Sequence, residues 1–105
     1  MSTSEQAIEQ EIQDKGLIAP RLTPKDIDAV IQSATYTVLP SGRVTVCELT
    51  LKNGYTVRGE SSCVSIENFN KELGEKISFE NARNEIWQLY GYLLKQRLFE
   101  AQLKD

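Results

Sequence analysis

The dipeptide Asn53-Gly54 lies between two stretches, residues 44–51 and 55–61, in which apolar and polar side chains alternate. Alternation with a period of two is typical of a β-strand that buries one face. A two-residue hairpin loop requires positive φ at both central positions, and Asn and Gly tolerate that geometry best. The sequence therefore predicts a β-hairpin that turns at Asn53-Gly54.

One further strand is predicted before this hairpin. From Thr35 onward, Tyr36 and Val38 alternate with threonines, and the Pro-Ser-Gly sequence of residues 40–42 is a turn signal. We therefore expect a meander of three antiparallel strands. Within the third strand, Gly59 predicts a bulge that curves the sheet. The alternative is a gap at Gly59 that a ligand or another chain approaches.

The same alternation predicts which side chains of the hairpin are buried. One face of the two strands carries Cys47, Leu49, Leu51, Tyr55 and Val57. The second cysteine, Cys63, follows the third strand. Because free cysteine behaves as a small apolar residue, we expect both thiols to be buried and unpaired.

A short helix is predicted before the sheet. Thr23 can cap its start, Pro24 suits the first helical position, and Asp26 lies in the first turn. We expect this helix to end near Ser33. Residues 17–105 would then form a single α+β domain.

The first 16 residues are polar and acidic, and they predict either a mobile arm or a short helix that Gly16 ends. Two capping boxes fit the start of such a helix: Ser2 with Glu5, and Thr3 with Gln6.

Residues 65–103 have mostly helical periodicity. At about 100° per residue, two apolar stripes in this region point in almost opposite directions. They are Ile66, Phe69, Leu73 and Ile77, and then Ala82, Ile86, Leu89 and Leu93. Either one helix is buried on two sides, or the helix breaks near Ser78, which would cap a second helix. We expect the break, with long C-terminal helices packed on one face of the sheet.

The last of these helices carries more apolar surface than a three-stranded sheet needs. Leu94 and Leu98 fall on one stripe, and Phe99 on another. Surplus apolar surface of this kind usually marks self-association. We therefore expect a homo-oligomer that forms through the C-terminal helix.

The composition argues against several classes of function. The chain has no histidine and a net charge of −3. Histidine is the commonest general base and the commonest metal ligand, and no phosphate-binding loop or nucleophile elbow occurs in the sequence. We expect no enzymatic activity, no cofactor and no metal site. The acidic balance also disfavours binding to nucleic acid, whose phosphates attract basic surfaces.

Targeting signals are not recognisable either. The start of the chain has neither the basic residues nor the apolar run of a secretory signal, and no apolar stretch is long enough to span a membrane. We expect a cytoplasmic protein that makes no membrane contact.

Two groups of residues are candidates for binding. The end of the third strand carries Arg58, Glu60, Ser61 and Ser62, whose charge and hydroxyls suit an anion such as phosphate. The alternative is a solvent-facing strand end. The second group consists of Trp87, Tyr90, Tyr92 and Phe99, which either stack bases or pack in the core and an interface.

The region from Val44 to Leu94 resembles the gene-product-49-like family of small tailed-phage and prophage proteins. The resemblance is carried first by the stretch from Cys47 to Ser61, with the sequence CELTLKNGYTVRGES. A second block agrees: Asn68-Phe69, Gly74, Asn81-Ala82-Arg83, Ile86-Trp87 and Gly91-Tyr92-Leu93-Leu94.

The resemblance implies a phage or prophage origin, an accessory role and no catalytic residues to carry over. Among the matching residues, Arg58, Ser61 and Arg83 are polar without an evident structural reason, so we assign them as candidate ligand-binding residues. We expect a small oligomeric binding module in the host-cell cytoplasm, with a counter-defence role through a host protein or a nucleotide signal. The alternative is a nucleic-acid-binding accessory factor, which would need Arg58, Arg83, Lys95 and Arg97 on one face.

Overall fold

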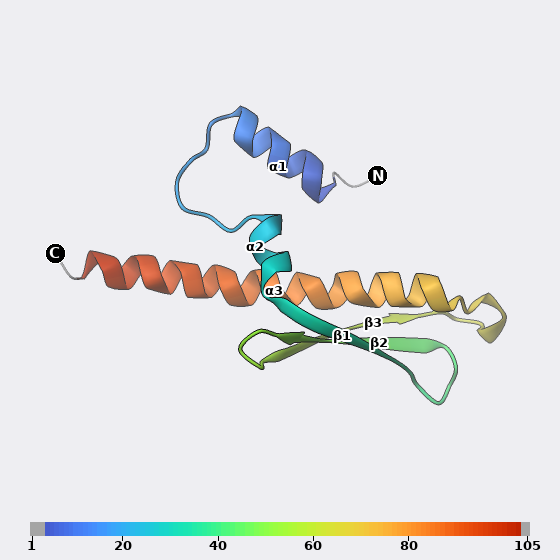
Figure 1. The fold of residues 1–105 in the computed structure, drawn as a ribbon. Helices are drawn as coiled ribbons and strands as arrows, with labels where there is room; N and C mark the ends of the chain where they lie inside the picture. Colours follow the sequence, from blue (N-terminus) through green and yellow to red (C-terminus); the bar gives the residue numbers. More distant parts are fainter. Residues whose placement is uncertain (1–3, 104–105) are drawn as a thin grey trace.

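A three-stranded antiparallel sheet and one long helix form the body of the computed structural model, which describes residues 4–103. The elements follow in the order α1 (Glu5–Asp14), α2 (Pro24–Ala29), β1 (Ile31–Val38), β2 (Val44–Leu51), β3 (Thr56–Ser62), the 3-10 turn η1 (Ile66–Asn68) and α3 (Lys71–Gln102). The strand order β1-β2-β3 confirms the predicted meander and the α+β class. Figure 1 shows α3 running along one face of the sheet, α2 crossing α3 in the view and leading into β1, and α1 on the side of α3 away from the sheet.

The hairpin loop has three residues, 52–54, between the closing residues Leu51 and Tyr55, so the predicted two-residue turn is wrong. Leu51 and Tyr55 close the hairpin, because the Leu51 N–H donates to the Tyr55 carbonyl at 2.8 Å. Gly54 takes φ +92°, whereas no residue other than glycine has positive φ among residues 4–103. Asn53 acts through its side chain instead, and its Oδ1 accepts from the Tyr55 N–H at 3.0 Å. A turn followed by a left-handed glycine is the usual three-residue hairpin.

The predicted helix start at Thr23 is confirmed, but the helix is shorter than expected. Thr23 and Asp26 form a reciprocal capping box, and Pro24 opens the helix. The helix ends at Ala29 rather than near Ser33. The strand that follows begins four residues earlier than predicted, because the chain from position 31 already pairs with β2. Pairing with a neighbouring strand overrides the helical spacing of these residues, which a local pattern cannot reveal.

The face of the sheet that α3 covers is the one that the alternation predicted. Cys47, Leu49, Leu51 and Val57 are buried there. The complete buried apolar core consists of Ile27, Cys47, Leu49, Leu51, Val57, Ala82 and Ile86. Tyr55 was also predicted to be buried on this face, but it is exposed because it closes the hairpin loop just before β3 begins. Both cysteines are free, but only Cys47 is fully buried and Cys63 is half-buried.

α3 is continuous from Lys71 to Gln102, so the expected break near Ser78 does not occur. The Ser78 hydroxyl donates to the Glu75 carbonyl within the helix rather than capping a new one. The side of α3 that faces the sheet is built mostly from small residues four positions apart: Gly74, Ser78, Ala82 and Ile86. Leu73 and Ile77, which the sequence suggested as core, are 53% and 40% exposed.

The predicted bulge at Gly59 is also absent. Gly59 pairs with Cys47 in an unbroken register between β2 and β3. The backbone of α3 at Ser78, Asn81 and Ala82 occupies the space where a side chain of residue 59 would lie. The glycine is therefore required for close packing of helix on strand.

The N-terminal segment forms the predicted short helix, α1, which carries no buried residue. Ser4 caps it, and its hydroxyl accepts from the Ala7 N–H at 3.0 Å. The predicted capping residues Ser2 and Thr3 lie outside the described part of the chain. Gly16 ends the helix as expected, with φ +67°.

The molecule is elongated, with principal extents of 59 × 32 × 19 Å. Its radius of gyration is 17.1 Å, whereas a compact chain of this length has about 13 Å. Figure 1 shows the reason, since the C-terminal half of α3 extends well beyond the sheet.

Candidate functional site

The three residues assigned from the sequence lie in three different environments. Arg83 is on α3, with 7% of its side chain exposed. Its guanidinium pairs with Glu5 of α1 at 2.6 Å and with Asp28 of α2 at 2.8 Å, and it donates to the Pro24 carbonyl. The hydrogen bonds to Glu5 and then to Asp28 raise the pKa of Arg83 above its ordinary value, against the opposing effect of burial. Arg83 therefore fastens α1 and α2 to α3.

Arg58 lies on β3 and is largely exposed. Its guanidinium is 3.6 Å from Glu48 on the neighbouring strand and donates to the Thr56 hydroxyl at 3.3 Å. Exposed pairs of this kind contribute little to stability. The Arg58 side chain therefore remains accessible to solvent.

Ser61 lies at the opposite end of β3 from Arg58. It lines a small pocket beside the first turn of α3, whereas Arg58 lines a larger one near the hairpin. The chain thus brings neither Ser61 nor Arg83 into the pocket that contains Arg58.

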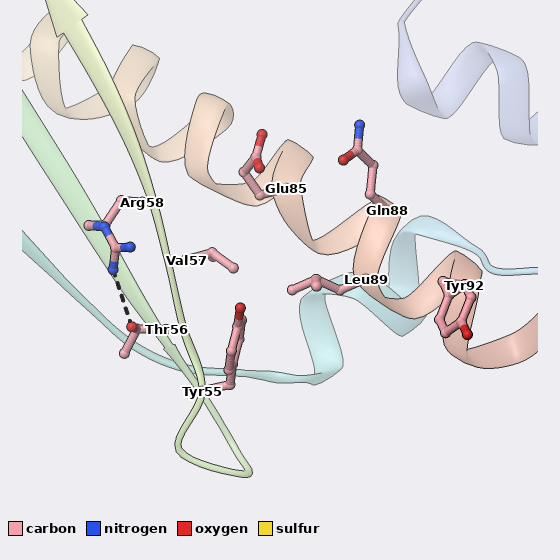
Figure 2. A pocket seen from close by; sticks show the side chains of 8 residues that line it. All are labelled: Tyr55, Thr56, Val57, Arg58, Glu85, Gln88, Leu89 and Tyr92. Atoms are coloured by element: carbon pink, nitrogen blue, oxygen red, sulfur yellow. Dashed lines mark hydrogen bonds between the residues drawn. The ribbon is translucent and has the colours of Figure 1, made fainter. Parts of the chain in front are cut away.

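The larger pocket, which we call the hairpin pocket, has a volume of about 400 Å³. It is lined by residues 55–58 from the hairpin, and by Glu85, Gln88, Leu89 and Tyr92 from α3. Figure 2 shows Tyr55 rising from the strand toward Leu89, with Tyr92 one turn further along the helix. The helical spacing of three places Leu89 and Tyr92 on neighbouring positions of the same surface.

An apolar pocket of about 300 Å³ adjoins the hairpin pocket. The two pockets share Tyr55, Leu89 and Tyr92. These three residues, which we call the tyrosine surface, are all exposed: Tyr55 by 57%, Tyr92 by 72% and Leu89 by 37%. Arg58, Glu85 and Gln88 supply charge and hydrogen-bonding groups along one side.

The hairpin pocket offers several hydrogen-bonding groups and one side chain of each charge. Its polar groups are two phenols, one hydroxyl, one amide, one guanidinium and one carboxylate. Among residues 4–103, no group of three or more Asp, Glu or Cys side chains is placed to hold a metal ion. No helix in that same part of the chain is long and apolar enough to cross a membrane.

Sequence reasoning did not identify Tyr55 as a site residue, and it considered Tyr92 only as a member of the aromatic run that either stacks bases or packs. Tyr55 alternates with buried residues, which predicts burial, but the hairpin loop begins beside it. For the aromatic run, the packing interpretation holds for Trp87 and Tyr90, which lie partly buried against the core. Tyr92 and Phe99 are exposed.

Comparison with protein families matched residues 22–98 to the family described as "Phage protein (N4 Gp49/phage Sf6 gene 66) family". The chain belongs to this phage protein family. The match includes the region from Val44 to Leu94 on which the sequence resemblance rested, and it extends over α2 and β1 as well. No curated protein and no solved structure matched the chain.

Within this phage protein, the matched region begins just before α2 and ends near the C-terminus of α3. It therefore contains the sheet, the tyrosine surface and Arg83, but leaves out α1. The hairpin pocket therefore lies within the region that matches the family, residues 22–98.

Proposed function

We propose that this phage protein is a non-enzymatic binding module that acts in the cytoplasm of the infected cell, and that its tyrosine surface docks onto a host protein. The observation that supports this proposal is the exposure of Tyr55 and Tyr92 beside each other on a groove with Leu89. Proteins rarely leave grouped aromatic and aliphatic side chains in water without a binding role.

The residue types at this surface favour a protein partner. Tyrosine and arginine are enriched among residues that dominate binding energy at protein interfaces. Tyr55 and Arg58 are positioned by a tight hairpin, and Tyr92 by a long helix. Rigid elements present side chains with little loss of entropy on binding.

The alternative of nucleic-acid binding receives less support. It requires Arg58, Arg83, Lys95 and Arg97 to face one ligand. Arg83 is buried in two ion pairs with carboxylates, so its charge is already neutralised. The net charge of −3 opposes approach to phosphates.

Self-association through α3 forms part of the proposal. The C-terminal half of α3 extends past the sheet and carries Leu94, Leu98 and the exposed Phe99. Two copies that paired through this segment would present two tyrosine surfaces, and linked surfaces gain avidity for a multivalent partner.

The proposal is tested by affinity capture from host lysate, followed by binding measurements with the purified candidate partner. The double variant Tyr55→Ser/Tyr92→Ser is expected to weaken binding by about 100-fold, which corresponds to the loss of two interface aromatics. Val64→Ser is the matched control, because Val64 is an even more exposed apolar residue that lies outside the tyrosine surface. A partner whose affinity survives the double variant would contradict the assigned surface. Retention of a cyclic nucleotide instead of a protein would replace the host-protein role with nucleotide sequestration.

A further inference from the structure

Thr45 presents a buried hydroxyl with no partner in the described chain. The residue is 1% exposed, and its Oγ1 makes no hydrogen bond. Thr45 lies on β2 opposite Ser61 of β3, so both side chains point toward α3. Buried polar groups are nearly always satisfied, and one without a partner points to a missing ligand or water.

The two hydroxyl residues line the same pocket, which we call the strand-end pocket. It has a volume of about 100 Å³ and lies between the ends of the strands and the first turn of α3. Gly74 forms part of its wall, where an added Cβ would lie 2.7 Å from the Thr45 Oγ1. The absence of a side chain at Gly74 therefore lets the helix start approach this hydroxyl.

The start of α3 gives the pocket a positive electrostatic character. α3 contains 32 residues, and Asn70 caps it by accepting from the Leu73 N–H. The preceding N–H groups of the first turn have no partner within a helix, and they carry partial positive charge. A helix N-terminus of this kind attracts phosphate and other anions.

Arg43 adds a full positive charge at the mouth of the same pocket. Its Nη1 donates to the carbonyls of Cys63 and Val64 at 3.4 and 3.3 Å. These bonds hold the guanidinium beside the pocket and leave its remaining N–H groups for another acceptor. Arginine is well suited to phosphate because its planar fork matches two phosphate oxygens.

We propose that the strand-end pocket binds a single phosphate group, with the hydroxyls of Thr45 and Ser61 and the guanidinium of Arg43 as donors, beside the positive end of the α3 dipole. A volume of about 100 Å³ accommodates one tetrahedral anion and leaves any attached nucleoside outside. The site lies at the opposite end of β3 from the tyrosine surface. It is therefore independent of the proposed protein-binding role.

The full-length protein is titrated with inorganic phosphate and, separately, with adenosine monophosphate, by calorimetry. Wild-type protein is expected to bind phosphate saturably, and Thr45→Val, Ser61→Ala and Arg43→Gln are each expected to weaken binding about tenfold, the effect of one lost donor. Tighter binding of the nucleotide would assign the phosphate to a nucleotide ligand, and equal affinity would assign it to free phosphate.

Two control variants separate a built site from general charge effects. Thr50→Val removes a hydroxyl from the opposite face of β2, and Arg58→Gln removes a charge from the hairpin pocket. Both are expected to bind phosphate within about twofold of wild type. Circular dichroism verifies that each variant is folded. The proposal is overturned if wild type shows no saturation up to about 10 mM phosphate, a concentration above the dissociation constant of a weak complex. It is also overturned if Thr45→Val binds phosphate like wild type, or if Arg58→Gln loses as much affinity as Arg43→Gln.

Discussion

The backbone of α3 crosses β3 directly over Gly59, where an added Cβ would lie 2.1 Å from the backbone nitrogen of Ala82. The same Cβ would lie 2.6 Å from the Ser78 carbonyl oxygen. This contact sets the distance between helix and sheet. Because the hairpin pocket and the strand-end pocket lie toward opposite ends of the same helix–strand contact, the position of Gly59 influences the geometry of both.

Gly59→Ala is expected to destabilise the protein strongly. The new methyl group overlaps with helix backbone rather than with a flexible side chain, so α3 must move away from the sheet. Overpacking of this kind costs up to about 3 kcal/mol. Urea denaturation followed by circular dichroism measures the change in the free energy of unfolding.

Gly91→Ala is the matched control for this prediction. Gly91 lies inside α3, and an added Cβ there would meet nothing within 4 Å. Alanine is favoured over glycine in a helix interior by about 1 kcal/mol, so this variant is expected to be slightly more stable than wild type. Equal stability of the two variants would show that Gly59 does not set the helix–sheet distance.

The sheet could be predicted from the sequence because alternation reports directly on which strand residues are buried. Cys47, Leu49 and Val57 follow that rule. The helix boundary at Ala29 could not be predicted, because it depends on pairing between residues far apart in the chain. The continuity of α3 was missed for a related reason. The contact with the sheet uses Gly74 and Ser78, which an analysis of apolar periodicity does not count as core.

The candidate site was only partly predictable. Arg58 was assigned because it is a polar residue without an evident structural reason in the stretch that resembles the phage family, and it lines the hairpin pocket. Arg83 looked similar in sequence, but its ion partners are 78 and 55 residues away along the chain. No local pattern reveals such partners. Thr45 gave no signal at all, because an unsatisfied hydroxyl is a property of three-dimensional packing.

Arg83→Met is expected to release α1 without unfolding the sheet. Methionine retains much of the apolar stem of the arginine but loses the bonds to Glu5 and Asp28. Because α1 buries no residue of its own, the charged bond from Arg83 to Glu5 carries much of its attachment. Hydrogen exchange of residues 5–14 is expected to accelerate about tenfold, the effect of losing roughly one charged hydrogen bond. Arg58→Met is the control and should leave this exchange unchanged, while a protected α1 in Arg83→Met would rule out the fastening role.

Acid is expected to loosen α1 through Glu9. The hydrogen bond from Arg21 lowers the pKa of Glu9 from 4.5 to about 2, and Gln13 adds to the effect. A lowered carboxyl pKa means that the stabilisation is fully present above pH 4.5 and is lost as the pH falls to about 2. Trp87, the sole tryptophan, lines the pocket beneath α1 together with Glu9 and Arg21. Its emission should therefore shift to longer wavelength over this pH range, and Glu9→Gln should remove that part of the transition.

The two cysteines are expected to react with a thiol reagent at very different rates. Cys47 is fully buried, and burial raises the pKa of its thiol, whereas Cys63 is only half-buried. In native protein, Cys63 should react at least about 100-fold faster, because Cys47 becomes reactive only on unfolding. Mass spectrometry of the labelled protein identifies the modified residue, and Cys63→Ala should abolish the fast phase. Early labelling at Cys47 would contradict its place in the core.

The C-terminal half of α3 is the segment through which we propose that the chain self-associates. It extends past the sheet (Figure 1). Leu94, Leu98 and Phe99 are outside the core cluster that contains Ala82 and Ile86. An isolated stretch of helix this short is marginal in water unless an apolar face packs against a partner. A second copy of the same segment would supply such a face.

Leu94→Glu/Leu98→Glu is therefore expected to convert an oligomer into a monomer, because burying two carboxylates at a helix contact is strongly unfavourable. Light scattering at micromolar concentration measures the mass, and circular dichroism verifies that the sheet and the core part of α3 remain folded. Lys95→Glu is the control, since it changes charge on an exposed position of the same helical turn without placing it among the leucines. A wild-type chain that is strictly monomeric at this concentration would rule out self-association through α3, and an oligomer that survives both leucine substitutions would place the contact elsewhere on the molecule.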